Sequence, residues 1–369
     1  MVDVGQHERV AVRRGRHRRD MPPPRRPWLL PAALAVLVVA TGGAVAAGAT
    51  AGTGAGSSAA SAPAPLAAAL RASARSATGA RPGATAAPTV STAPTRAPEQ
   101  PSVQRAVVPG AELLTWGGVT RRALTFSPPV QTTALPLLLV LHGRASNPHG
   151  EERRTGFDAL AASGDAVVAY PEAVGPSWNA GACCDGAQAD DSGFLVALTQ
   201  RLVAQGVVDP ARVYAVGFST GGMMAYRLAC DAPGLLAGVG SVGGVLLTPC
   251  PGALRVPLVD VHSRLDTLVP LRGTRSSRTL GGIALPGVGD VVDGWRRRTG
   301  CTGRLYAAAV VPVGSTEHPV ELRDVRGCAA GAAVRLYLTT AHAHVWPQAA
   351  DGLDASVVVW DFLRRQRRS

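Results

Sequence analysis

From about residue 136 onward, short apolar runs alternate with longer segments of helical periodicity. The runs over Pro136–His142, Ala166–Tyr170 and Val213–Phe218 contain few polar side chains, which is typical of strands buried on both faces of a parallel sheet. We expect further strands over 236–245, 256–261 and 333–339, and helices over 192–205, 221–230, 291–298 and 355–365, the first of these capped by Asp191 or Ser192. This alternation predicts an α/β protein with a doubly wound, mostly parallel sheet and helices on both faces.

Positive charge is concentrated at the N-terminal end of the chain. The 369 residues include 37 basic residues, all of them Arg, against 25 acidic ones, a net charge of +12. Residues 1–105 hold 13 Arg and 4 acids (+9), so residues 106–369 carry only +3. Because a nucleic-acid-binding domain needs a basic face on its folded part, we expect no nucleic-acid partner.

The N-terminal segment predicts export. A strongly apolar core over 28–40 follows the Arg-rich start, and its length fits a signal peptide better than a membrane span. Residues 44–46 offer a small-residue cleavage site, and Arg25-Arg26 faintly resembles a twin-arginine signal. An uncleaved signal anchor that tethers the protein to the membrane is the alternative. We therefore expect a secreted or cell-surface protein.

Composition predicts three parts of the chain. Residues 1–49 form the Arg-rich signal peptide or anchor. Residues 50–105 consist of Ala, Gly, Ser, Thr and Pro with scattered Arg, which predicts a disordered linker. Residues 106–369 form one folded domain of ordinary size, expected to be a monomer.

The six cysteines predict disulfides rather than a metal site. Their number is even, none has CxxC spacing, and the chain is expected in an oxidising compartment. A bond between the adjacent Cys183 and Cys184 would form a strained ring, so separate partners are expected for these two residues. The expected pairs are Cys301–Cys328, with Cys183 and Cys184 shared between Cys230 and Cys250.

The segment Gly217-Phe218-Ser219-Thr220-Gly221 matches the nucleophile elbow G-x-S-x-G. An apolar strand runs directly into it and a helix starts directly out of it. The glycines allow strand and helix to approach closely, while the serine takes a strained backbone conformation that exposes its hydroxyl. We interpret Ser219 as a nucleophile; a Gly-rich turn with a capping serine is the structural alternative.

The hydrolase order of serine, then acid, then histidine restricts the other members of a triad. Asp266 lies in the loop at the C-terminal end of the strand over 256–261, where such sites are built, whereas Asp260 falls within the strand. His344 follows the last expected strand, with His342 as its alternative, while His318 lies in an acidic-flanked turn. The predicted triad is therefore Ser219, Asp266 and His344.

The loop His142-Gly143-Arg144 follows the first apolar strand and is the expected second half of an oxyanion hole. The predicted donors are the backbone N–H of Thr220 and that of Gly143 or Arg144. His142 is expected to hold this loop rather than to transfer protons.

A second glycine pattern, G-x-G-x-x-G over 238–243, predicts no dinucleotide site. It follows a helix and continues into apolar residues, whereas a dinucleotide-binding motif stands between a strand and a following helix. We interpret it as part of a strand.

Several motifs in one order resemble the secreted polyhydroxybutyrate-depolymerase-like esterases, which include feruloyl and acetylxylan esterase relatives. They are LHG at 141–143, WNAGACC at 178–184, DDSGF at 190–194, VYAVGFSTGGMMAYRLAC at 213–230, HSRLD at 262–266, GC at 300–301 and 327–328, and HVWP at 344–347. The resemblance implies an α/β-hydrolase fold and the same triad. It also places Trp178 and Trp346 near the substrate groove, with ordinary packing as the alternative.

The expected function is therefore hydrolysis of carboxylic esters, such as short hydroxyalkanoate, aromatic or acetyl esters, through an acyl-enzyme and without a metal or organic cofactor. The chain departs from the family at Ser263, where a glycine is usual, and at residues 341–343, where Ala, His and Ala replace glycines. An envelope acyltransferase with the same triad and a catalytically inactive surface binding module are the alternatives.

Overall fold

The computed structural model describes residues 108–184, 188–275, 282–311, 318–325, 327–328, 331–340 and 343–368. The predicted signal segment and linker, residues 1–105, lie outside these ranges, as does the expected domain start at Ala106. Among the described residues, no helix is both long and apolar enough to cross a membrane.

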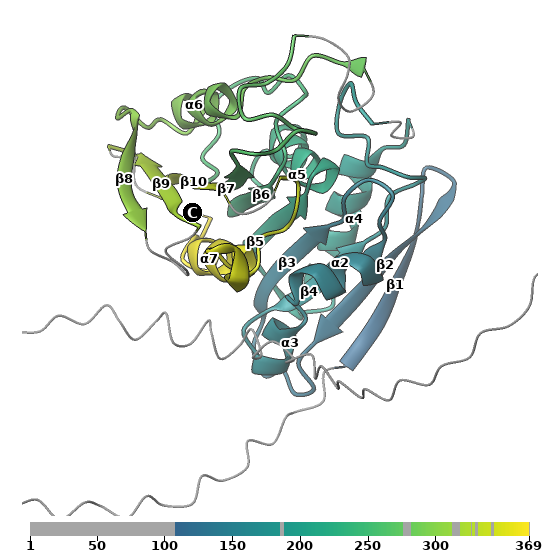
Figure 1. Cartoon of the computed structure of the whole chain (residues 1–369). Helices are drawn as coiled ribbons and strands as arrows, with labels where there is room; N and C mark the ends of the chain where they lie inside the picture. The colour runs from purple at the N-terminus through teal and green to yellow at the C-terminus, as the bar shows by residue number, and fades with distance from the viewer. Residues whose placement is uncertain are drawn as a thin grey trace, which may run out of the picture. The chain divides into compact units, whose positions relative to one another are not determined.

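A single mixed sheet organises the described chain (Figure 1). Its strands lie in the order β1-β2-β4-β3-β5-β6-β7-β10-β9-β8. In chain order they are β1 (Val108–Trp116), β2 (Val119–Ser127), β3 (Leu135–Leu141), β4 (Val167–Pro171), β5 (Val208–Phe218), β6 (Gly238–Val242), β7 (Leu258–Ser263), β8 (Leu305–Val311), β9 (Val320–Val325) and β10 (Val334–Thr339). The strands from β4 to β10 in this order pair in parallel, and antiparallel strands flank them on both sides.

Helices cover both faces of the sheet (Figure 1). One face carries α4 (Asp191–Ala204), α5 (Thr220–Asp231) and α6 (Val288–Arg298). The other carries α2 (Pro148–Thr155), α3 (Ala159–Ser163) and α7 (Ala355–Leu363), and a short 3-10 helix, η2 (Ala349–Asp351), precedes α7. The doubly wound, mostly parallel architecture predicted from the alternating pattern is confirmed.

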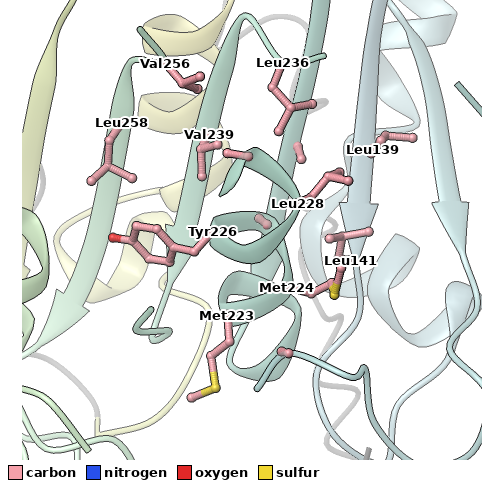
Figure 2. Close-up of a cluster of buried hydrophobic side chains, with 14 of the residues drawn as sticks. Leu139, Leu141, Met223, Met224, Tyr226, Leu228, Leu236, Val239, Val256 and Leu258 are labelled. Carbon is pink, nitrogen blue, oxygen red and sulfur yellow. The ribbon is translucent and has the colours of Figure 1, made fainter. Parts of the chain in front are cut away.

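The core follows from the two faces of the central strands. Leu139 and Leu141 on β3 point toward α5 and pack with Met224 and Leu228, as Figure 2 shows. Leu138 and Val140, the alternate residues of β3, belong to the second cluster under α2, α3 and α7. Because both faces are covered, the whole strand is apolar.

The outer strands and short helices were missing from the sequence prediction. β1, β2 and β9 mix polar with apolar residues, because they lie in the outer, antiparallel parts of the sheet, whereas β8 is an apolar run that the sequence prediction left out. The cap of α4 is Asp190, whose carboxylate accepts a hydrogen bond from Gly193 N–H at 2.9 Å, so the expected cap at Asp191 or Ser192 was wrong by one residue. Asp191 instead forms a buried ion pair with Arg121 of β2 at 2.7 Å.

The disulfides are Cys183–Cys184, Cys230–Cys250 and Cys301–Cys328. The last pair was predicted, but the sharing of Cys183 and Cys184 between Cys230 and Cys250 was wrong. Cys184 takes a left-handed backbone conformation with φ of 78°, which turns the two neighbouring side chains toward each other. Cys230 and Cys250 then lie 5.1 Å apart between their Cα atoms, an ordinary distance for a disulfide.

Candidate active site

Ser219 stands at a sharp turn between β5 and α5. Its backbone has φ of 54° and ψ of −118°, a strained conformation for a residue with a side chain. Its N–H donates to the Val242 carbonyl of β6 at 2.8 Å, and its own carbonyl accepts from Met223 N–H at 3.0 Å. Backbone hydrogen bonds to the sheet and to the helix therefore fix the turn, as a nucleophile elbow requires.

The glycines of the elbow make this turn possible. A Cβ on Gly221 would overlap the backbone carbonyl of Leu141, and one on Gly217 would overlap the backbone of Gly221. Strand β3, the turn and the first residues of α5 are thus closer together than any side chain would permit.

His344 lies against Ser219 and Asp266. Its Nε2 is 2.9 Å from the Ser219 hydroxyl oxygen, and its Nδ1 is 2.6 Å from Oδ2 of Asp266. The imidazole also packs on the Phe218 ring, with ring centroids 5.0 Å apart. Gly243 also borders the imidazole closely, since a Cβ at Gly243 would lie 3.3 Å from Cε1 of His344. The structure therefore brings together the three residues predicted from the sequence.

Asp266 is held in place by the loop that follows β7. Its Oδ1 accepts hydrogen bonds from the N–H groups of Leu268 and Val269, at 2.9 and 2.8 Å. The carboxylate is buried, with 1% of its side chain exposed, and its Oδ2 faces His344. The alternative acid, Asp260, lies inside β7, where its Oδ2 accepts from the Tyr226 hydroxyl at 2.8 Å.

The alternative histidines occupy other places. His318 lies against Gly352, ahead of α7. His342 falls outside the described residues.

The loop after β3 borders the elbow. A Cβ on Gly143 would lie 3.6 Å from Cβ of Ser219, so the backbone of this loop lies close to the candidate nucleophile. His142 holds the loop: its Nδ1 donates to the Gly143 carbonyl at 2.9 Å, and its Nε2 accepts from Ala173 N–H at 3.1 Å. Burial lowers the pKa of His142 and favours this neutral form.

Trp178 and Trp346 are both buried. The Trp178 indole N–H donates to the His142 carbonyl at 2.9 Å, beneath the same loop. The Trp346 indole donates to the Ser356 hydroxyl at 3.0 Å, and its ring packs edge-on against Phe157. In this structure both residues make the packing contacts that were the alternative to a place in a substrate groove.

Two features around the candidate triad were not predicted. Leu265, Leu268 and Val345, which flank Asp266 and His344 in sequence, are among the most exposed large apolar side chains of the described chain. Arg154 of α2 places its guanidinium 4.8 Å from the centre of the Phe218 ring. Exposure and long-range packing decide both features, and neither leaves a pattern in the sequence.

Comparison with known families identifies similar proteins. Residues 121–284 match the family model described as Esterase PHB depolymerase. Curated relatives include "Putative esterase NocK" of Nocardia uniformis subsp. tsuyamanensis, 35% identical over 47% of this chain and 53% of its own length. Feruloyl esterase B of Piromyces equi is 28% identical over 46% of this chain and 33% of its own. Poly(3-hydroxybutyrate) depolymerase of Ralstonia pickettii is 35% identical over 34% and 28%.

The chain thus spans about half, or less, of the length of these relatives. Among solved structures, an acetyl xylan esterase from Aspergillus awamori superposes with a TM-score of 0.50 at 13% identity, over 69% of this chain and 98% of that one. This likeness shows the α/β-hydrolase fold. The predicted resemblance to the polyhydroxybutyrate-depolymerase-like esterases is therefore confirmed over the matched residues.

Proposed function

We propose that this protein is an exported serine esterase that hydrolyses carboxylic esters with Ser219 as nucleophile, His344 as base and Asp266 as the orienting acid. The observation that carries the proposal is the pair of hydrogen bonds at His344, 2.9 Å to the Ser219 hydroxyl and 2.6 Å to Asp266. Nucleophile, base and orienting acid within hydrogen-bond reach are the geometry of an activated serine.

In the proposed reaction, the Ser219 oxygen attacks the ester carbonyl carbon while Nε2 of His344 takes the hydroxyl proton. Asp266 stabilises the resulting imidazolium through Nδ1–H. The tetrahedral intermediate collapses, and His344 returns its proton to the departing alcohol. Water then attacks the acyl-enzyme with His344 again as base, which releases the acid and restores the serine.

The developing oxyanion needs donors beside Ser219. Thr220 is the first residue of α5, so its N–H has no partner within the helix and is available there. The loop with Gly143 and Arg144 borders Ser219 on the other side and supplies the second proposed donor, the N–H of one of these two residues.

The surroundings of the triad support a substrate with an apolar acyl or aromatic part. Leu265 and Leu268, beside Asp266, are 53% and 47% exposed, and Val345, beside His344, is 42% exposed. Burying part of this apolar surface under a substrate would contribute to binding. Short hydroxyalkanoate, feruloyl and acetyl esters are therefore the first substrates to test.

Export is supported by the three disulfides of the folded domain, because such bonds persist in oxidising compartments. The apolar stretch over 28–40 supports the same proposal.

The test is fluorophosphonate labelling of the purified protein with peptide mapping, beside p-nitrophenyl ester hydrolysis. We expect the label on Ser219, and we expect Ser219→Ala to abolish labelling and lower kcat by about 10⁴-fold or more. Ser127→Ala, in β2, is the matched control and should retain wild-type turnover. A folded wild-type protein that takes no label contradicts the proposal and favours a binding module, and product transfer to an added sugar in place of hydrolysis indicates an acyltransferase.

A further inference from the structure

A cluster of buried polar side chains lies next to Asp266, inside the protein. Asp260 and His262 alternate with apolar residues along β7 and point to the face covered by α5. Both side chains are fully buried. Tyr226 of α5, whose hydroxyl Figure 2 shows turned toward the strand with Leu258, donates to Asp260. His262 in turn lies between the carboxylates of Asp260 and Asp266.

His262 contacts the loop that holds the candidate acid. Its Nε2 lies 2.8 Å from the Val269 carbonyl oxygen and 3.5 Å from Oδ2 of Asp266. A carbonyl only accepts, so Nε2 carries the hydrogen and donates to Val269. The N–H of the same Val269 donates to Oδ1 of Asp266. The His262 imidazole thus holds Val269, whose N–H binds Oδ1 of Asp266. The same imidazole also lies beside Oδ2 of Asp266.

The opposite side of the ring faces Asp260. Nδ1 of His262 is 3.9 Å from Oδ1 of Asp260, and neither atom has a hydrogen-bond partner among the described residues. Burial raises the pKa of Asp260 to about 6, and His262 opposes that rise.

We propose that His262 is a positioning residue of the esterase reaction, which holds the loop from Asp266 to Val269 so that Asp266 meets Nδ1 of His344. The inference rests on the proposed function, because it matters only if His344 becomes charged during turnover. A carboxylate displaced by about 1 Å orients the imidazole poorly and lowers the rate about 10²-fold. Substrate contacts do not involve His262, so KM stays unchanged.

The test compares His262→Leu with His262→Gln. Leu removes the donor to Val269, whereas the Gln amide nitrogen can occupy the place of Nε2 and restore it. We expect His262→Leu to lower kcat 10- to 100-fold with KM within about 2-fold of wild type. His262→Gln is expected to recover to within about 5-fold of the wild-type kcat.

Rates are counted per active site, by titration with the fluorophosphonate, so that loss of folded protein does not appear as loss of catalysis. Val259→Ala is the matched control, because it removes core volume from the same strand on the opposite face. It should lower stability and leave kcat per titrated site unchanged.

Two results overturn the inference: a wild-type kcat per site in His262→Leu, or equal losses in the Leu and Gln variants. Either result leaves the proposed function intact if the wild type is labelled on Ser219. A wild type that takes no label at Ser219 instead removes the proposed function, and the inference with it.

Discussion

Glu151 is a buried carboxylate beside the candidate oxyanion loop. Its side chain is inaccessible to solvent, and one oxygen accepts a hydrogen bond from Arg154 at 2.8 Å. Burial raises the pKa of Glu151 from 4.5 to about 7, and Arg154 and the Gly143 backbone offset only part of that rise. Between these two pH values the folded protein holds a proton that the unfolded chain has lost. The free energy of unfolding therefore decreases as the pH rises through this window.

Replacing this carboxylate tests that sign. The rise of the Glu151 pKa from 4.5 to about 7 corresponds to about 3 kcal/mol of unfolding free energy lost between pH 4.5 and pH 8. Glu151→Gln cannot ionise, so it should remove most of this loss and unfold at a higher guanidinium concentration than wild type at pH 8. The measurement is guanidinium unfolding of both proteins at pH 5 and pH 8. An equal change with pH in the two proteins would show that Glu151 titrates near its ordinary value.

At the scale of elements, the elbow depends on how closely α5 approaches β3. Gly221 is the second residue of α5, and a Cβ there would overlap the Leu141 backbone carbonyl. Gly289 holds the same position in α6, but a Cβ there meets nothing within 4 Å. Two glycines at equivalent helix positions therefore differ only in what surrounds them.

Gly221→Ala should separate α5 from β3 and destabilise the protein by about 3 kcal/mol, the upper part of the range for overpacking. It should also slow fluorophosphonate labelling, because Ser219 moves with the helix. Gly289→Ala should be neutral or stabilise by up to about 1 kcal/mol, since alanine favours the helix and restricts the unfolded chain. Thermal unfolding measures both, and similar melting temperatures for the two variants would contradict the packing argument.

At the scale of the whole described chain, the disulfides constrain segments of very different length. Cys230–Cys250 joins the end of α5 to the loop beyond β6 across 20 residues. Cys183–Cys184 joins neighbours, so it restricts almost none of the unfolded chain. In the chain-entropy description, stabilisation grows with the closed loop.

The double variant Cys230→Ser/Cys250→Ser should therefore lose about 3 kcal/mol of unfolding free energy. Cys183→Ser/Cys184→Ser removes the same number of sulfurs and should lose clearly less. Guanidinium unfolding under non-reducing conditions gives both values. A larger loss for the neighbouring pair would mean that its packing, rather than loop closure, is what stabilises the protein.

The central strands, the major helices and the three residues of the candidate triad could be predicted from the sequence, because the signals that mark them are local. An apolar run such as Leu137–Leu141 is apolar because both faces are covered, and G-x-S-x-G around Ser219 records a backbone conformation that only those neighbours permit.

The remaining features depend on contacts between distant residues, and only the tertiary structure decided them. β9 is short, and its alternation of apolar and polar residues breaks at Arg323-Asp324, so its place follows from pairing with β10. The burial of Arg121 follows from Asp191, 70 residues away. The link between Cys183 and Cys184 depends on the backbone conformation at Cys184, and the role inferred for His262 depends on where Val269 turns back. Partner choice across such separations is set by packing and burial, which composition and periodicity do not encode.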